Sequence, residues 1–547
     1  MDYNKLAELL FPDVVNGPDY YEKKFPERDL PKGAEVTRMA PSPTGFIHLG
    51  NLYSALADER IAHRNGGVFY LRIEDTDEKR KVDGAVETII NVLRYFDIEF
   101  DEGAGFTDAD PQNVYGPYFQ RQRVEIYHAY AKDLVKRGLA YPCFCTEEEL
   151  EEVRKEQEED KAMTGYYGKY AVCRNLTLED IEAKLKAGLT YVLRLRSAGS
   201  PDKEIVFHDR IMGEIKLPEN IHDIVLLKRD GVPTYHFAHA IDDHLMRTTM
   251  VIRGGEWLAS VPTHYELFHV LGFKMPSYGH TAHLMKFDEE TGGKRKLSKR
   301  KDPELSLDYY RKDGYHPMAM KVYLLTLLNS NFEEWYEKFP DKDIKEFPFS
   351  VEKMSQSGAL FDKDKLHNIC KNELAKLSEE MYDFLYDWAA GNEPEKAKVW
   401  FANREKMLAI LRLYMGIGMK RRRKDFIYAK QIFELIGYFF EENNDAEEFK
   451  FDKDTVKEIL KEYLAGYDHN DDNSAWFDKL KKVADNLSFA SDMKAYKANP
   501  ENYKGSISDI AEVVRIAVTG RANTPDLWTI IHIIGEDAMK AKIERLC

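Results

Sequence analysis

The order of hydrophobic and polar positions predicts an α/β unit near the start of the chain. Residues 35–41 (EVTRMAP) alternate like a strand that runs into the loop SPTG, and residues 68–75 (VFYLRIED) alternate again. Between them, residues 50–65 carry apolar side chains at helical spacing. A strand, a helix and a second strand form a βαβ unit, so we expect a parallel sheet.

Strand and helix signals return in a second set after Asp223. The segments DIVLLKRDG, TYHFAHAIDD and MVIRGGEW come first, followed by a predicted helix at 259–271 and a predicted strand at 278–284. Residues 118–222, between the two sets, have a different composition and the strand-like segment YVLRLR. We therefore expect an insertion that interrupts one sheet. Beyond about residue 345 the pattern is nearly all helical.

Composition excludes several classes of protein. The 547 residues are too many for one hydrophobic core, and 43% hydrophobic with 32% charged residues is typical of a globular protein. No apolar run is long enough to cross a bilayer, and the N-terminus lacks the pattern of a secretory signal. Five cysteines in so long a chain do not form a disulfide framework, so we expect a reducing, cytoplasmic setting and no membrane partner.

The net charge of −16 argues against a nucleic-acid partner, because proteins that bind phosphate backbones usually present lysine and arginine. Binding depends on local charge, however, and residues 420–424 (KRRRK) form a basic run. Taken alone, this run is more often a solvated helix face. Composition therefore leaves the partner open.

The segment 40–51 (APSPTGFIHLGN) is the most informative in the chain. It combines a strand end, a loop punctuated by proline and glycine, and a helix start. A helix N-terminus offers unpaired N–H groups and a positive dipole end that suit phosphate. Gly45 and Gly50 permit close backbone approach, and His48 can donate hydrogen bonds to a phosphate. A plain βα turn is the alternative of similar weight.

A second candidate lies at residues 294–301 (KRKLSKRK), which follow Gly292 and Gly293. Lysine and arginine around a serine, after a glycine hinge, make a cationic loop suited to clamping a triphosphate. By itself this segment favours an exposed basic turn.

Together the two segments resemble the signature pair of the class I aminoacyl-tRNA synthetases. H-L-G-N stands where that family has H-I-G-H, and K-L-S-K-R where it has K-M-S-K-S. Asn51 is the departure, because the family signature has a second histidine there. The resemblance sharpens to the bacterial glutamyl-tRNA synthetases through further blocks in the same order: R-M-A-P-S-P-T-G, L-R-I-E-D-T-D, P-T-Y-H-F, D-D-H-L, V-I-R-G-G-E-W and R-I-A-V-T-G.

The resemblance implies an α/β fold with a Rossmann-like catalytic domain, split by an acceptor-binding insertion and followed by an all-α anticodon-binding domain. It places the domains as follows: an N-terminal extension at 1–33, the two catalytic halves at 34–117 and 223–302, the inserted acceptor-stem-binding domain at 118–222, a stem-contact helical domain at 303–375 and the helical anticodon-binding domain at 376–547.

The resemblance also implies the chemistry. ATP with Mg²⁺ activates L-glutamate to glutamyl-adenylate, and glutamate then passes to the 3′ end of tRNA(Glu). His48 and Lys299 are expected to stabilise phosphate charge during catalysis. The residues expected at ATP are Thr44, Gly45, His48, Gly50, Glu256, Lys296, Ser298 and Lys299. The residues expected at glutamate are Arg38, Ala40, Ser42, Glu74, Tyr235, His239 and Arg253.

Three cysteines in the predicted insertion raise the question of zinc. Some members of the family bind zinc through C-x-C followed by C-x-H, and here Cys143, Cys145 and Cys173 are present. Asn175 replaces the last ligand and is a poor one, although Tyr166, Tyr167 or Tyr170 offers an oxygen. We therefore expect buried free thiols, with zinc as the alternative.

Several alternatives stay open on the sequence. A glutaminyl-tRNA synthetase is the nearest, although its loop differs from APSPTG and Arg253 argues against it. A small-molecule nucleotidyltransferase would not need the helical tail, and a non-catalytic tRNA-binding paralogue would usually have lost His48 or Lys299. Whether tRNA(Gln) is a second substrate is not specified. A monomer is expected, although no pattern fixes the oligomeric state.

Overall fold

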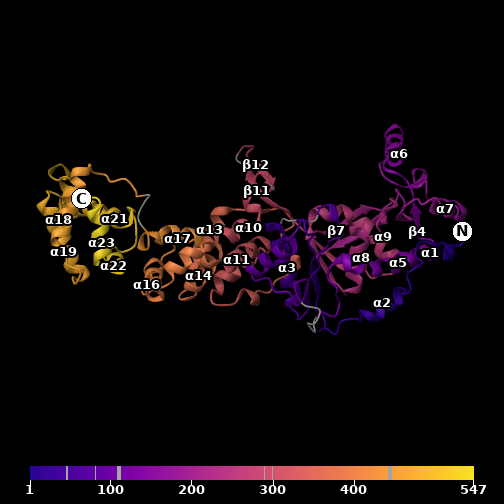
Figure 1. The fold of residues 1–547 in the computed structure, drawn as a ribbon, viewed down its shortest axis with the longest axis horizontal. Helices are drawn as coiled ribbons and strands as arrows, with labels where there is room; N and C mark the ends of the chain where they lie inside the picture. The colour runs from indigo at the N-terminus through magenta and orange to yellow at the C-terminus, as the bar shows by residue number, and fades with distance from the viewer. Residues whose placement is uncertain (45–46, 81, 107–112, 289, 299, 442–445) are drawn as a thin grey trace. The chain divides into compact units, whose positions relative to one another are not determined.

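The computed structural model describes residues 1–44, 47–80, 82–106, 113–288, 290–298, 300–441 and 446–547. The chain forms two compact units: the first comprises Met1–Arg311 and Lys321–Asp362, and the second comprises Lys312–Met320 and Lys363–Cys547. Two of the boundaries fall inside α10 (Leu307–Asp313) and α11 (Pro317–Leu328). Both helices are labelled in Figure 1. Within the described residues, no helix combines the length and the apolar character that crossing a membrane requires.

Two sheets carry the first unit. One contains, in spatial order, the parallel strands β1 (Val36–Met39), β2 (Val68–Leu71) and β3 (Glu102–Gly103). The other contains, in spatial order, β7 (Gly213–Pro218), β6 (Glu204–Asp209), β10 (Ser277–Thr281) and β9 (Met250–Gly254). In this second sheet β6, β10 and β9 are parallel, and β7 is antiparallel to β6. A hydrogen bond of 2.9 Å from Thr249 N to Val36 O brings the start of β9 beside β1.

Helices connect these strands. They are α3 (Leu49–His63), α4 (Ala85–Tyr95), α8 (Tyr235–Leu245) and α9 (Val261–Leu271). The predicted α/β fold with a parallel sheet, an insertion and a helical tail is confirmed.

Two predicted strands are shorter than the alternation of the sequence suggested. β2 ends at Leu71 rather than at residue 75, because Ile73 N donates to Tyr118 O and the chain exchanges its sheet partner. The strand expected at 278–284 is split, since β10 ends at Thr281 and β11 (Leu284–Asp288) begins a separate hairpin with β12 (Gly293–Lys296). Alternation therefore located both strands but not the points at which their partners change.

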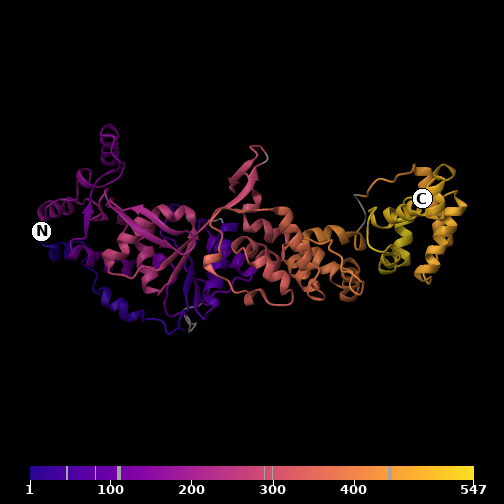
Figure 2. The same cartoon turned by 180° about the vertical axis from the view of Figure 1, so that it is seen from behind.

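The insertion has a small antiparallel sheet of its own. Its elements are α5 (Val124–Lys136), β4 (Ala140–Cys143), α6 (Glu147–Glu159), α7 (Leu178–Lys186) and β5 (Val192–Leu195), and β5 also pairs with β8 (Val225–Leu227). Figures 1 and 2 both show α6 standing away from this sheet. The β6–β7 hairpin lies in the predicted range of the insertion, yet it extends the sheet that contains Arg253.

The first 33 residues fold onto the rest of the first unit. Asp2 caps α1 (Tyr3–Leu10) by accepting from Lys5 N at 3.0 Å, and Leu6 is fully buried. Glu22, in α2 (Pro18–Lys24), bonds the Tyr130 hydroxyl at 3.0 Å and Arg247 Nη2 at 2.9 Å. Short apolar runs between prolines had suggested only an extension, but these residues form two helices that contact α5 and the end of α8.

The first unit also contains a fourth sheet. The remaining elements of the unit are α12 (Phe332–Lys338) and β13 (Ala359–Leu360), and the sheet has the order β12-β11-β13.

The second unit is built from helices around one apolar core. They are α13 (Lys363–Leu374), α14 (Glu380–Asn392), α15 (Pro394–Trp400), α16 (Arg404–Met415), α17 (Ala429–Ile436), α18 (Lys453–Gly466), α19 (Asn473–Asn486), α20 (Met493–Ala498), α21 (Ile507–Thr519), α22 (Leu527–Ile534) and α23 (Glu536–Glu544). Trp388, Trp400 and Phe433 belong to the core, which matches the helical pattern expected beyond residue 345.

The basic run 420–424 is not on a helix. Gly416 has φ 64° and ends α16 in the left-handed conformation that favours glycine, so the run follows as an irregular segment. Arg423 pairs with Asp425 at 2.6 Å, and Lys424 Nζ donates to Asn372 Oδ1 at 2.6 Å. The interpretation as a solvated helix face is therefore wrong.

Candidate active site

A cavity of about 630 Å³ lies at the carboxyl ends of β1 and β9. This is where parallel α/β sheets usually bind ligands. The following residues predicted from the sequence line it: Arg38, Ala40, Ser42, His48, Gly50, Glu74, Tyr235, Arg253, Glu256 and Lys296. Thr44, His239 and Ser298 are not among its lining residues. Gly45 and Lys299 lie outside the described residues.

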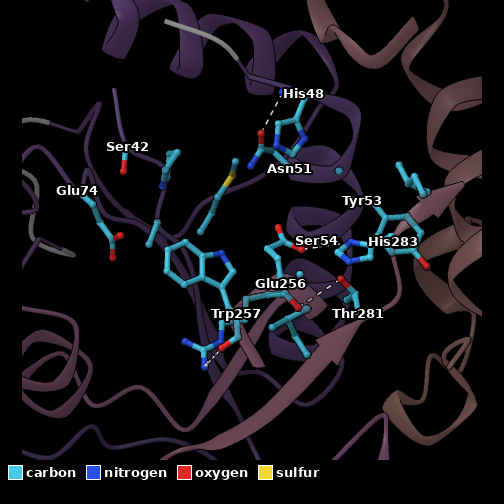
Figure 3. Close-up of a pocket in the computed structure, with 18 of the residues that line it drawn as sticks. Ser42, His48, Asn51, Tyr53, Ser54, Glu74, Glu256, Trp257, Thr281 and His283 are labelled. Carbon is cyan, nitrogen blue, oxygen red and sulfur yellow. Dashed lines mark hydrogen bonds and ion pairs between the residues drawn. The ribbon is translucent and has the colours of Figure 1, made fainter. Parts of the chain in front are cut away.

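The first signature segment contributes the start of α3. His48 is the N-cap residue, and its backbone N donates to Asn51 Oδ1 at 2.9 Å (Figure 3). Asn51, the departure from the family signature, thus fixes the backbone at the helix N-terminus, where unpaired N–H groups favour an anion. A Cβ on Gly50 would lie 3.0 Å from His48 Nδ1, so glycine leaves room for this imidazole.

The second signature segment is held at its base by a carboxylate. The Asp302 carboxylate accepts hydrogen bonds from both terminal nitrogens of Arg295, at 2.6 and 2.8 Å, and from the backbone N of Ser298, at 2.9 Å. These bonds, first the one from Arg295, lower the pKa of Asp302 to about 2. Lys296, at the end of β12, lines the cavity and lies 4.0 Å from Glu256. Lys296 and Leu297 therefore line the cavity, and Asp302 anchors Arg295 and Ser298.

One side of the cavity is an arginine–carboxylate cluster. Asp243 Oδ1 accepts from Arg72 Nη1 at 2.7 Å and from Arg38 Nε at 3.4 Å. Arg72 Nη2 also donates to Glu74 Oε1 at 3.1 Å. Burial opposes the charge on Arg38, but the combined attraction of nearby groups, Asp243 first among them, raises the pKa of Arg38. Burial raises the pKa of Glu74, and the Arg72 charge offsets part of that rise.

Arg253, which also lines the cavity, is held by uncharged groups. Arg253 Nε donates to His280 Nε2 at 2.9 Å, Nη1 lies 3.1 Å from His264 Nδ1, and Nη2 donates to the Trp257 carbonyl at 3.3 Å. Burial first, and then the neighbouring His239 and Arg253, lowers the pKa of His264 well below its ordinary value. Arg253 itself is 6% exposed. The two arginines predicted to bind carboxylates therefore line one cavity in different electrostatic surroundings.

His239 lies behind the cavity. Its side chain is fully buried, its Nε2 lies 2.8 Å from the Tyr278 hydroxyl, and its Nδ1 lies 3.2 Å from Asp243 Oδ2. The ring stacks with Tyr235 at a centroid distance of 5.5 Å. A direct contact with substrate was expected from the resemblance, but in this structure His239 supports Tyr235 and Asp243.

Several cavity residues were not assigned a role from the sequence. Figure 3 shows Trp257, Thr281 and His283 projecting around the cavity with Glu256, and Asp58 also lines it. Thr281 ends β10 and His283 follows two residues later, so they share the signal that parallel strands bring ligands to their carboxyl ends. Arg72 and Asp243 lie in the quoted blocks L-R-I-E-D-T-D and D-D-H-L. Arg72 directly follows the apolar strand β2 and Asp243 lies in α8, and a charge in an apolar segment is the signal of a buried pair.

The three insertion cysteines come together. Their sulfur atoms all lie within 4.8 Å of one another, and each side chain is buried. The Tyr166 hydroxyl lies 3.3 Å from the Sγ atoms of both Cys143 and Cys145. Hydrogen bonds with Cys145 and Cys173 lower the pKa of the Cys143 thiol, and hydrogen bonds with Cys143 and Cys173 raise the pKa of the Cys145 thiol.

Known proteins match this chain along its whole length. Residues 35–368 match the family model described as tRNA synthetases class I (E and Q), catalytic domain, and residues 376–547 match the anticodon binding domain. A glutamate--tRNA ligase of Acetivibrio thermocellus is 55% identical over 551 residues, 100% of both chains, and one of Sorangium cellulosum is 40% identical over 98% of this chain and 99% of its own.

Solved structures agree. The crystal structure of a glutamate tRNA ligase from Elizabethkingia meningosepticum in complex with its amino acid has a TM-score of 0.71 and 28% identity, covering 94% of this chain and 99% of its own. The predicted resemblance is confirmed: the chain belongs to the class I tRNA synthetases of the glutamate and glutamine group.

Proposed function

We propose that this protein is a glutamate–tRNA ligase that activates L-glutamate with ATP and transfers it to tRNA(Glu). The observation that carries the proposal is the pair of guanidinium groups, Arg38 and Arg253, that line one cavity together with Glu74. Glutamate has two carboxylates and one ammonium group, and this set supplies two cations and one anion for them. The names of the relatives point to the same amino acid.

In the first step the glutamate α-carboxylate attacks the α-phosphorus of ATP in line, and pyrophosphate leaves. Glu74 faces the ammonium group and Arg253 binds the side-chain carboxylate, so that the amino acid is oriented toward the phosphate. His48, at the start of α3, and Lys296 supply donors for phosphate oxygens from opposite segments of the cavity. Lys299 is the further cation that the second signature segment contributes.

In the second step the hydroxyl of the terminal adenosine of tRNA attacks the carbonyl carbon of glutamyl-adenylate, and AMP leaves. No side chain acts as a nucleophile, so positioning and charge neutralisation supply the catalysis. The helical tail contacts the anticodon, and the basic run 420–424 contributes to holding tRNA phosphate. None of the five cysteines is in a disulfide, which fits a reaction in the reducing cytoplasm. We further propose that the enzyme is a monomer.

Mg²⁺ that accompanies ATP would be held by one or two carboxylates together with phosphate oxygens and water. Glu256 is a carboxylate that fits this requirement, because it lines the cavity and its side chain is half exposed. The ion would neutralise phosphate charge, and Glu256 would orient it.

ATP–pyrophosphate exchange with glutamate and with glutamine, each with and without tRNA, tests the proposal. We expect exchange with glutamate that depends on, or is stimulated by, tRNA(Glu), and little exchange with glutamine. Exchange driven by glutamine alone would identify the glutaminyl enzyme instead. The absence of exchange with both amino acids, in a protein that still binds tRNA, would identify a non-catalytic paralogue. Aminoacylation of purified tRNA(Glu) and tRNA(Gln) then defines the tRNA specificity.

We also propose a structural zinc ion in the insertion, held by Cys143, Cys145, Cys173 and the Tyr166 oxygen. Three buried sulfur atoms within 4.8 Å of one another and a hydroxyl 3.3 Å from two of them fit a four-ligand site. Metal analysis of the purified chain is expected to give about one zinc per molecule, and Cys173→Ser is expected to lose most of it. An unmodified chain without zinc, prepared without chelator, would restore the interpretation as free thiols.

A further inference from the structure

Arg253 is the centre of a buried ladder across three neighbouring strands. His280 of β10 is the direct register partner of Arg253 of β9, and Asp209 of β6 pairs with β10 two residues earlier, at Tyr278. The ladder runs from Arg253 Nε to His280 Nε2 at 2.9 Å and from His280 Nδ1 to Asp209 Oδ2 at 2.6 Å. Three strands therefore present these side chains in one row.

The chemistry of arginine fixes the direction of every hydrogen bond in this row. A guanidinium group has five N–H donors and no acceptor, so His280 Nε2 must accept. The His280 proton is then on Nδ1, from which it is donated to the Asp209 carboxylate. Asp209 Oδ1 is occupied by the backbone N–H groups of Ile211 and Met212, at 2.9 and 2.8 Å. His280 is thus held as one tautomer of the neutral imidazole.

The same reasoning applies on the other side of Arg253. His264 Nδ1 must accept from Arg253 Nη1, so the His264 proton is on Nε2. Nε2 lies 2.9 Å from His236 Nδ1, which therefore accepts. Burial and the charge of Arg253 lower the pKa values of His236 and His264, in agreement with neutral rings.

A count of donors shows what remains for a ligand. His280, His264 and the Trp257 carbonyl take one N–H each from Nε, Nη1 and Nη2. One N–H is left on Nη1 and one on Nη2, so each terminal nitrogen keeps a donor for a carboxylate. Arg253 lines the cavity, where such a ligand would bind.

We propose that His280 and His264 are positioning residues that orient the Arg253 guanidinium for the side-chain carboxylate of the amino acid substrate, with Asp209 fixing the tautomer of His280. The inference rests on the proposed function, because it requires Arg253 to bind that carboxylate. It adds three residues to those that determine the specificity for glutamate. None of the three belongs to the cavity lining, so each acts through Arg253.

The two imidazoles use different nitrogens, and this permits a crossed test. Glutamine can place its side-chain oxygen near the position of histidine Nε2, whereas asparagine can place its oxygen near Nδ1. At position 280 the acceptor is Nε2, so His280→Gln is expected to retain function and His280→Asn to lose it. At position 264 the acceptor is Nδ1, so the expectation is reversed: His264→Asn retains function and His264→Gln loses it.

The readout is KM for glutamate and for ATP in tRNA-supported pyrophosphate exchange with the full chain. We expect the two variants without the acceptor, His280→Asn and His264→Gln, to raise KM for glutamate roughly ten- to hundredfold. This is the range for one hydrogen bond to a charged group. KM for ATP is expected to change less than about twofold in all four variants, and the two variants with the acceptor are expected to lie within about fivefold of the unmodified enzyme. A loss of the same size for asparagine and glutamine at both positions would overturn the proposal, because it would indicate packing alone.

Arg253→Gln separates this inference from the proposed function. If that substitution leaves KM and kcat for glutamate unchanged, the carboxylate assignment in the proposed function fails. If it is damaging while all four histidine variants resemble the unmodified enzyme, only the positioning role fails. In the Arg253→Gln background, His280→Asn is expected to add less than about twofold, because its effect passes through the missing guanidinium. Independent, multiplicative losses would contradict the proposal.

Discussion

The two arginines of the cavity differ in what holds them. Arg38 shares the carboxylate of Asp243 with the fully buried Arg72, so its charge is compensated inside the protein. Arg253 is bonded to the neutral rings of His280 and His264, and the nearest carboxylate in its row, Asp209, is one imidazole farther away. We refer to these as the Arg38 side and the Arg253 side.

This difference indicates that the two arginines have different roles. A carboxylate beside an arginine stabilises its burial but also weakens its attraction for a second anion. Neutral acceptors fix the orientation of a guanidinium without cancelling its charge. We therefore expect substitutions on the Arg38 side to affect mainly the stability of the fold, and those on the Arg253 side to affect mainly the use of glutamate.

The largest effect on stability is expected for Asp243→Asn. The substitution leaves Arg72, which is fully buried, without its closest anion. Breaking a buried pair by neutralising one partner costs about 3–5 kcal/mol, so we expect a loss of that size in the free energy of unfolding. Urea unfolding measures it, with Asp133→Asn as the control, because Asp133 pairs with Arg137 at the surface at 3.3 Å. Equal effects of the two substitutions would remove the structural role of Asp243.

The largest effect on activity is expected for Arg253→Gln. Losing a buried charged partner of a ligand carboxylate is expected to lower kcat/KM for glutamate by roughly two to three orders of magnitude, with KM for ATP little changed. The free energy of unfolding is expected to fall less than in Asp243→Asn, because the groups left behind are neutral. Steady-state exchange and urea unfolding of the same preparations give both numbers. A stability loss larger than that of Asp243→Asn, with glutamate use intact, would reverse the assignment of the two sides.

An intermediate effect is expected from pH. Burial and then the charge of Arg253 lower the pKa of His236 from 6.5 to about 4, and His264 and Tyr235 also face this ring. Because the folded pKa of His236 lies below the unfolded one, the unfolded chain binds a proton more readily between pH 6.5 and 4. The free energy of unfolding is therefore unaffected by this group above pH 6.5 and falls as the pH drops toward 4. A single group contributes a slope of up to about 1.4 kcal/mol per pH unit in that window.

The matched variant is His236→Gln, which keeps a polar side chain but does not titrate. Urea unfolding at a series of pH values between 7 and 4 should show a shallower slope for this variant than for the unmodified chain. Identical slopes would mean that the Arg253 side does not hold this ring neutral.

The smallest effect is expected for Tyr278→Phe. The substitution keeps the ring, whose centroid lies 4.8 Å from the Arg253 guanidinium carbon, and removes only the hydroxyl that lies 2.8 Å from His239 Nε2. We expect a loss of about 1 kcal/mol in the free energy of unfolding and a change in KM for glutamate of less than about twofold. A large rise in KM for glutamate would mean that Tyr278, like His280 and His264, orients Arg253.

Much of the fold was predictable because local patterns carry it. The alternation at 35–41 and the helical spacing at 50–65 correspond to β1 and α3, and the helical tail was visible from its apolar period. The first 33 residues were harder, since their two helices are short and each is stabilised by contacts with distant residues such as Tyr130 and Arg247. The ends of β2 and β10 were misplaced because a change of strand partner leaves no mark in the alternation.

The sequence alone determined which kinds of residues are available: a loop and helix start with His48, a basic segment around Lys296, and two arginines with a glutamate for an amino acid that bears two carboxylates. Tertiary structure decided how those groups are held. The pairing of β6, β10 and β9 brings Asp209, His280 and Arg253 into one row although 71 residues separate the first two. Hydrogen-bond direction and charge compensation depend on distances between atoms of different strands, and no local pattern in one chain encodes them.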